Sequence, residues 1–191
     1  MEQEIAMADL RYPIGRFSWV APENEEQSAQ DRVRYINVIS KLAANMRAAV
    51  QDLDVKQLDT PYRPEGWTVR QVVHHVPESH MNAYIRFKLA ITEDQPQIKP
   101  YNEAAWAKLP DNNVTPIETS LQLLTALHSR RVDTLRSMQP SDFGRTLYHP
   151  EHGVVTLDRM LAMYSWHSDH HVAHIKSLRE RMGWNTQVAA Q

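Results

Sequence analysis

The feature that most limits the fold of this chain is the helical spacing of its apolar residues. Over four long segments, apolar residues recur three or four positions apart, as they do on the buried face of an amphipathic helix. These segments run from about Glu23 to Leu53, from Thr68 to about Thr92, from Pro116 to about Met138, and from Leu157 to Gly183. Four long helices joined by extended connections predict an all-α fold, a four-helix bundle.

Several helix starts and one helix irregularity can be read directly from the sequence. Thr68 and Gln71 fit a capping box, and Thr156 is suited to cap the last helix. Thr115 is expected to cap the third helix, with a proline at the first helical position. Pro77 lies inside the second helix and is expected to interrupt and kink it, because its ring removes one backbone hydrogen bond.

The segments outside the four helices are expected to pack onto one domain that spans residues 1–191. Residues 1–22 are interpreted as an N-terminal arm. Residues 93–114 form a long connection with a short helical turn near Glu103–Lys108. Residues 145–149 and 154–156 predict a small β-hairpin before the last helix.

Composition narrows the class of protein. The chain has 191 residues and a formal net charge of −2, which indicates no obligatory nucleic-acid or membrane partner. It has no cysteine, so disulfides and a thiolate nucleophile are excluded. It also lacks an apolar run of the roughly 18 residues that suggest a transmembrane helix, and a signal peptide at its start. We therefore expect a cytoplasmic protein.

Seven of the ten histidines fall in two clusters, one on the second and one on the fourth predicted helix. They are His74, His75 and His80, and His167, His170, His171 and His174. Helix bundles build metal sites from inward-facing side chains on different helices. Two histidines from one helix and one from another would leave a coordination position open, which is the pattern of a catalytic metal site.

Helix phase separates the histidines of the last helix in part. His167 and His171 continue the apolar stripe of that helix, whereas His170 and His174 lie about 60° further round. The phase therefore favours His167 and His171 as the inward-facing pair, with His170 and His174 beside the site or facing solvent. On the second helix, phase alone does not choose between His74 and His75.

The remaining polar and aromatic candidates have simpler interpretations. A single histidine is more often a core or surface residue than a metal ligand. This interpretation is given to His80, His128, His149 and His152. Asp169, His170 and Glu78 are candidates to orient metal ligands, or are solvated side chains. Trp67, Trp106 and Trp166 are expected to anchor the core or the loops.

A set of short motifs covers nearly the whole chain. It comprises Tyr12–Gly15, Leu58–His75, Ser79–Lys88, Lys99–Tyr101, Tyr148–Pro150, Trp166–Ile175 and Arg181–Trp184. In combination these motifs resemble the YfiT-like metal-dependent hydrolases of the DinB superfamily. The chain departs from the family where Pro77-Glu78 replaces the usual Ala-Asp, next to the expected metal site.

The resemblance implies a DinB-like four-helix bundle, commonly a homodimer, with one divalent metal ion per subunit. It implies His75 as the first ligand, because that histidine precedes an aliphatic residue. It implies His167 and His171 as the other two, because a polar side chain and Ile175 follow this pair. Imidazole ligands suit zinc or nickel, among other metals.

These observations predict a metal-dependent hydrolase that activates water for attack on a small-molecule substrate. Only His80, Asp169 and His170 are candidates for a general base. One alternative is a metal-dependent S-transferase, in which the metal activates the thiol of a low-molecular-weight cofactor. A second alternative is a non-catalytic binding or stress protein that the metal stabilises.

Overall fold

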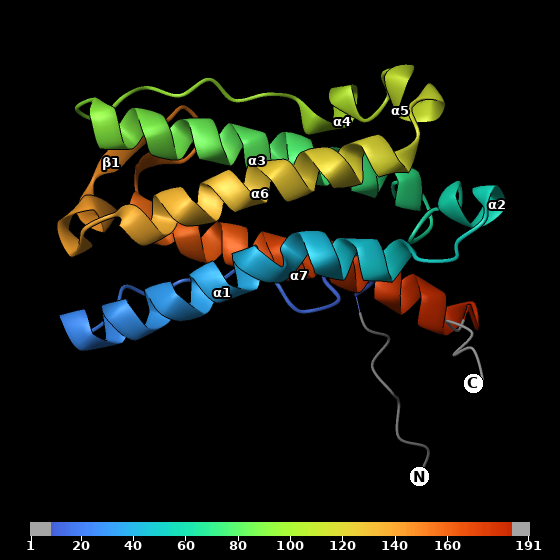
Figure 1. Cartoon of the computed structure of the whole chain (residues 1–191), viewed down its shortest axis with the longest axis horizontal. Helices are drawn as coiled ribbons and strands as arrows, with labels where there is room; N and C mark the ends of the chain where they lie inside the picture. Colours follow the sequence, from blue (N-terminus) through green and yellow to red (C-terminus); the bar gives the residue numbers. More distant parts are fainter. Residues whose placement is uncertain (1–8, 185–191) are drawn as a thin grey trace, which may run out of the picture.

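A computed structural model describes residues 9–184, and its long helices form a four-helix bundle (Figure 1). The four are α1 (Glu25–Val50), α3 (Val69–Thr92), α6 (Ile117–Ser137) and α7 (Leu157–Arg181). Both α1 and α3 pack against α6 and against α7, which closes the bundle. The predicted fold class is therefore confirmed. Residues 1–8 of the predicted arm and residues 185–191 of the predicted domain lie outside the described residues.

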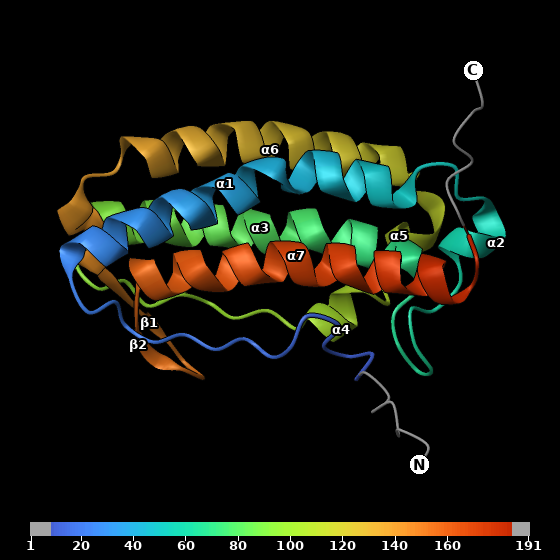
Figure 2. The same cartoon turned by 90° about the horizontal axis from the view of Figure 1, so that it is seen from below.

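The order of the helices in space departs from a simple up-and-down arrangement. The connection after α3 runs back along the length of the bundle, so that α3 and α6 point in the same direction, as do α1 and α7 (Figures 1 and 2). This connection contains the short helices α4 (Glu103–Trp106) and α5 (Asp111–Val114). The predicted helical turn corresponds to α4, whereas α5 was not predicted.

The remaining elements are short. Helix α2 (Val55–Leu58) follows α1, and a 3₁₀-helix, η1 (Pro140–Gly144), follows α6. The predicted hairpin is confirmed as β1 (Thr146–His149) and β2 (Gly153–Thr156), which pair antiparallel. No helix within residues 9–184 is both long and apolar enough to cross a membrane.

Two of the predicted helix starts are confirmed by hydrogen bonds. The Thr68 hydroxyl accepts from the backbone N–H of Gln71, and the Gln71 side chain accepts from the backbone N–H of Thr68, which completes the capping box. The Thr156 hydroxyl accepts from the N–H of Arg159 at the start of α7. Each bond satisfies a backbone donor that a helix start leaves free.

Two other predictions about helices were wrong. Thr115 does not cap α6, because the residue that directly precedes Ile117 is Pro116 and no side chain caps this helix; the Thr115 N–H donates to the carbonyl of Asp111 at the end of α5. Pro77 does not interrupt α3, which continues through it to Thr92 as the predicted helix does; the kink at Pro77 stays a prediction. A long helix whose inner face is packed tolerates the loss of the single backbone hydrogen bond that a proline removes.

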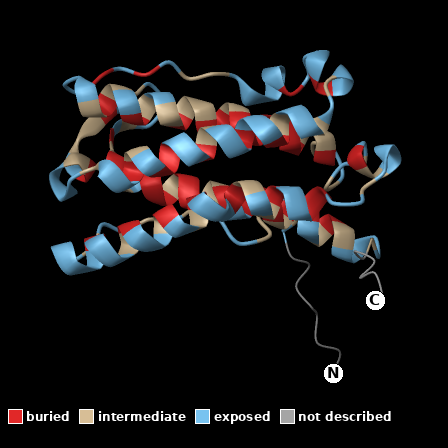
Figure 3. Ribbon diagram, viewed as in Figure 1, coloured by how far each residue is buried: buried red, intermediate tan, exposed pale blue. Residues whose placement is uncertain are grey.

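The core is divided along the bundle by a layer of polar side chains. One apolar cluster contains Ile39, Phe87, Leu135 and Leu161, and the other contains Leu42, Val72, Leu124 and Ile175. The layer between the two clusters comes from three helices. It contains His80 of α3, His128 and Arg131 of α6, and His167 and His171 of α7, and only His167 is partly exposed. Buried residues face the inside of the bundle in Figure 3.

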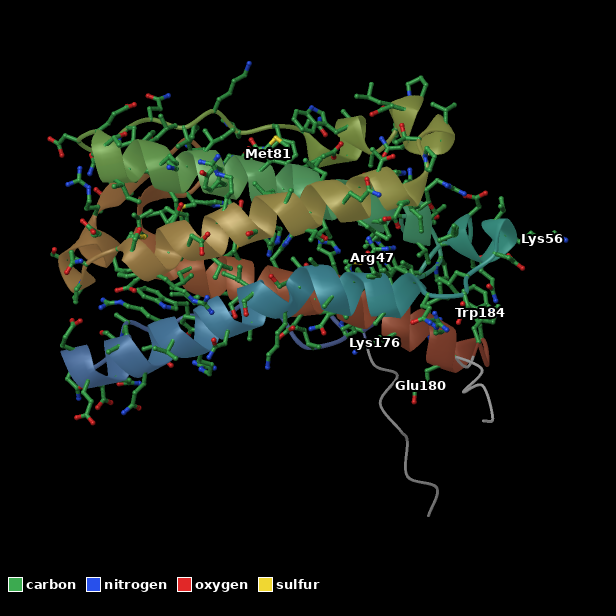
Figure 4. The ribbon with its side chains drawn as sticks, in the orientation of Figure 1. Arg47, Lys56, Met81, Lys176, Glu180 and Trp184 are labelled. Atoms are coloured by element: carbon green, nitrogen blue, oxygen red, sulfur yellow. The ribbon has the colours of Figure 1, made fainter. Side chains whose placement is uncertain are left out.

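Helix α7 presents opposite faces to this layer and to solvent. Asp169, Lys176 and Glu180 are exposed, and Figure 4 shows Glu180 pointing away from the bundle. The exposed positions lie seven and four residues apart, as a solvated helix face requires. The histidines of α7 therefore lie on the side that faces its neighbours.

Candidate metal centre

The structure brings three histidines of two helices together. One ring nitrogen each from His75 on α3 and from His167 and His171 on α7 lie within 4.8 Å of one another. The Nε2 atoms of His167 and His171 are 3.1 Å apart. His75 and His171 are buried and His167 is partly exposed. These are the three residues that were predicted as ligands.

The helices position these rings through their packing. His167 and His171 are one turn apart, so both project from the same face of α7. Helix α3 runs antiparallel to α7 and contacts it, which places His75 opposite the pair (Figure 1). The indole of Trp67, just before the helix cap, lies 4.7 Å from the His75 ring between centroids and holds it from the outer side.

Burial keeps the three imidazoles neutral. It lowers the pKa of His75 to about 4, and it lowers the pKa values of His167 and His171 well below 6.5, with a further contribution from the neighbouring imidazoles. Neutral imidazole carries the lone pair that a metal ligand needs. Buried Nδ1 atoms of His75 and His171 have no hydrogen-bond partner in the described residues. This donor set fits a divalent cation with nitrogen ligands.

The neighbouring histidine on α3 has a different environment. The Nδ1 atom of His74 lies 2.7 Å from the hydroxyl oxygen of Ser120 on α6, and the ring is outside the group of three. Of these two residues, which helix phase did not separate, His75 is the one whose ring lies near the α7 histidines, and its role as a ligand stays a prediction.

His170 and His174 are not solvent-facing, and that part of the prediction was wrong. Both rings are buried: Trp166 stacks on His170 at 4.2 Å between centroids, and Tyr62 stacks on His174 at 3.9 Å. The reason is tertiary, since helix phase does not anticipate which loops cover a helix. Trp166 is therefore an anchor, as predicted, and its ring contributes to the wall of the site.

The described part of the N-terminal arm covers the same side of α7. The Trp166 indole N–H donates to the carbonyl of Gly15 at 3.1 Å, and His174 Nε2 lies 3.1 Å from the carbonyl oxygen of Arg11. In Figure 2 the segment before α1 runs along the side of the bundle that carries α7 and the hairpin. Gly15 and Arg11 of this segment thus contact α7 through their backbone carbonyls.

None of the carboxylates proposed to orient the ligands does so. Asp169 is exposed, and Glu78 is half-buried with no side-chain hydrogen bond to any of the three histidines. Across residues 9–184, no carboxylate is hydrogen-bonded to His75, His167 or His171. The carboxylates that line the cavity are Glu65, Glu103 and Glu151, and none of them belongs to the group of three ligand atoms.

The three histidines lie in the wall of a cavity of about 740 Å³. Its aromatic walls come from the arm, the loops and α7, and include Tyr12, Tyr62, Trp67, Tyr101, Tyr164 and Trp166. Arginines at its rim include Arg63, Arg86 and Arg159. The tip of the hairpin adds His149, Glu151 and His152, whose ligand atoms also lie within 4.8 Å of one another but are more exposed.

Comparison with known proteins places this architecture in a family. The sequence profile of the DinB superfamily matches residues 39–175, which is well over half of the chain. The chain belongs to the DinB superfamily.

Individual relatives of this DinB-superfamily chain support the YfiT-like resemblance. A Bacillus mycoides protein named "Putative metal-dependent hydrolase" is 53% identical over 178 residues, which are 93% of this chain and 100% of that protein. A Bacillus cereus protein of the same name is 52% identical over the same shares. The solved structure of YfiT from Bacillus subtilis superposes with a TM-score of 0.86 at 46% identity, over 92% of this chain and 99% of that one. It is described as "a probable metal-dependent hydrolase with an unusual four-helix bundle topology".

In this DinB-superfamily chain, three buried residues lie behind the candidate metal centre, and their contacts with one another were not predicted. His80 is fully buried, so the hypothesis that it acts as a base in the cavity was wrong. It contacts His167, His128 and Arg131 instead. A signal existed, because His80 continues the apolar stripe of α3 and the other two continue that of α6.

Proposed function

We propose that this chain is a metal-dependent hydrolase whose divalent ion, zinc or nickel, is held by His75, His167 and His171. One observation supports the proposal: a ring nitrogen from each of three neutral imidazoles lies within 4.8 Å of the other two, at the wall of a large cavity. Three protein ligands leave a position open for a reacting molecule. The names of its relatives also describe metal-dependent hydrolases.

A bound divalent cation would lower the pKa of a water molecule and polarise a carbonyl group. The residues of the chain would supply the rest of the site. Burial raises the pKa of Tyr101 to about 12, so that its hydroxyl stays protonated and can donate a hydrogen bond to a substrate oxygen. The aromatic walls would exclude bulk water and hold the apolar part of a substrate.

The arginines at the rim suggest one property of the substrate. Arg63, Arg86 and Arg159 line the cavity, and within residues 9–184 none of them forms an ion pair with a carboxylate. Guanidinium groups bind carboxylates and phosphates in a forked geometry. We therefore expect the substrate to carry an anionic group away from the bond that reacts.

A metal-dependent S-transferase is the second candidate, and a specific observation favours it. Hydrolysis commonly uses a general base beside the metal, and within residues 9–184 no carboxylate is hydrogen-bonded to the three histidines or belongs to their group of ligand atoms. A thiol needs less help, because coordination alone deprotonates it. A cavity of about 740 Å³ also has room for a thiol cofactor together with an electrophile.

One experiment separates these candidates. The zinc-loaded protein is tested on panels of esters and amides without thiol, and on a haloaromatic electrophile with glutathione or cysteine. The hydrolase proposal expects turnover without thiol that His75→Ala abolishes. Turnover that requires the thiol would replace it with the S-transferase. No turnover in either panel would contradict both and favour a metal that only stabilises the bundle.

A further inference from the structure

A line of three buried histidines leads from the metal centre to the backbone of α1. His80 Nε2 lies 3.2 Å from Nδ1 of His167, and His80 Nδ1 lies 3.0 Å from Nε2 of His128. His128 Nδ1 in turn lies 2.8 Å from the carbonyl oxygen of Ile39. His80 is 0% exposed and His128 is 3% exposed, so water does not compete for these contacts.

The carbonyl at the end of this line dictates one arrangement of protons. A neutral imidazole has one N–H donor and one acceptor nitrogen, and a carbonyl oxygen only accepts. His128 must therefore carry its proton on Nδ1, and its Nε2 can accept from Nδ1–H of His80. His80 Nε2 then accepts from Nδ1–H of His167. This order leaves Nε2 of His167, which faces His171, with a free lone pair.

Arg131 favours the opposite arrangement. Its Nη1 lies 2.7 Å from Nδ1 of His80, and a guanidinium group can only donate. When Arg131 donates, the proton of His80 moves to Nε2 and points at His167 Nδ1. The proton of His167 then occupies Nε2, the atom a metal ion would need. His80 Nδ1 and His128 Nε2 would also face each other as two acceptors.

The surroundings of Arg131 show that its position is costly. The side chain is 1% exposed, its Nε and Nη2 atoms have no hydrogen-bond partner, and it forms no ion pair within residues 9–184. Its guanidinium lies 4.8 Å from the ring centroid of Tyr164 and 5.8 Å from that of Phe87. A buried cation without a counter-charge is unusual unless it serves a function.

We propose that His80 is a positioning residue for metal binding at His167, and that Arg131 holds His80 in the tautomer that opposes it. Cation binding and the Arg131–His80 hydrogen bond then exclude each other. The inference rests on the three-histidine site of the proposed function, but not on the reaction catalysed there. It gives the buried arginine a role in setting the affinity for the cation.

The first test reads the tautomer in the unmodified protein. Protein labelled with ¹⁵N-histidine is titrated with zinc, and proton–nitrogen correlation spectra identify which nitrogen of His80 carries the proton. The proposal expects the proton on Nε2 before zinc and on Nδ1 after it. The same tautomer in both states would overturn the proposal. A protein that binds no zinc would overturn the metal site, and with it the proposed function.

The second test compares zinc affinities by calorimetry. Arg131→Met should bind zinc about tenfold more tightly, because it removes a competing hydrogen bond to a charged donor. His80→Leu should bind about 10–100-fold more weakly, the usual cost of losing a partner behind a metal ligand. His80→Gln should recover most of the affinity, since its amide oxygen can accept from His167 Nδ1–H.

Arg130→Met is the matched control, because Arg130 is the exposed neighbour on α6 and its loss should leave zinc affinity unchanged. A merely structural role for Arg131 would weaken zinc binding in Arg131→Met or leave it unaltered, and either result would overturn the proposal. Should a variant fail to fold, the tautomer measurement on the unmodified protein still decides the question.

Discussion

His74 and His75 are adjacent in sequence but face different helices. His74 lies against Ser120 on α6, and His75 faces the pair on α7. His75→Ala should therefore weaken zinc binding by more than the roughly 10–100-fold that loss of an outer partner costs, because a ligand itself is removed. Calorimetric titration of each variant measures this.

The matched control for this prediction is His74→Ala. It should keep zinc affinity within a few-fold of the unmodified protein and lose only the contact with Ser120. Equal losses in the two variants would show that the rings act through packing of α3 rather than through coordination.

At the level of residues, the sequence predicted side-chain direction but not what would cover each side chain. Phase placed His167 and His171 on the inner face of α7, and the structure agrees. It did not foresee that Trp166 and the arm would bury His170. The periodicity of a single helix contains no information about segments far away in sequence.

Between elements, one buried ion pair joins α1 to α7. The Arg32 guanidinium donates from Nε and Nη2 to the two carboxylate oxygens of Asp158, at 2.8 and 2.7 Å. Arg32 is 8% exposed, and removal of Asp158 leaves its guanidinium with Glu25 as its remaining carboxylate partner. Asp158→Ala should lower the free energy of unfolding by about 1.5–3 kcal/mol, the typical contribution of a hydrogen bond to a charged group, because Glu25 still pairs with the guanidinium. Urea denaturation measures this change.

Glu25 provides the comparison for that pair, because it binds the same guanidinium with a side chain that is 67% exposed. Glu25→Gln should lower the free energy of unfolding by no more than about 1 kcal/mol. Similar losses for the two variants would contradict the view that burial determines the contribution of each carboxylate.

The sequence predicted long elements better than short ones. All four long helices follow from apolar spacing, which sums over many residues. Thr115 shows the limit for short signals, since its sequence matches a helix cap but α6 begins one residue later than this match requires, after Pro116 and without a side-chain cap. The parallel pairs of helices were also not predicted, because the path of residues 93–114 depends on contacts with the whole bundle.

For the whole molecule, the buried histidines predict loss of stability in acid. Burial lowers the pKa of His75 and of His128 from 6.5 to about 4. Between these pH values the unfolded chain binds protons that the folded chain does not. The free energy of unfolding should therefore be highest above about pH 6.5. Between about pH 6.5 and 4 it should fall by about 1.4 kcal/mol per pH unit for each such histidine.

Urea denaturation at several pH values between 7.5 and 4.5 measures this dependence. The free energy of unfolding should decline steadily below pH 6.5, and His128→Asn should decline less steeply because one buried imidazole is gone. A free energy of unfolding that is constant over this range would show that the histidines are not buried in the neutral form.

The central claim is that His75, His167 and His171 together hold one divalent ion. Elemental analysis of freshly purified protein, beside the three single alanine variants, tests it most directly. The proposed site predicts about one divalent ion per chain in the unmodified protein, and loss of that ion in each variant while the helical content is retained. An unmodified protein without metal, or any of the three variants with full metal content, would contradict the claim.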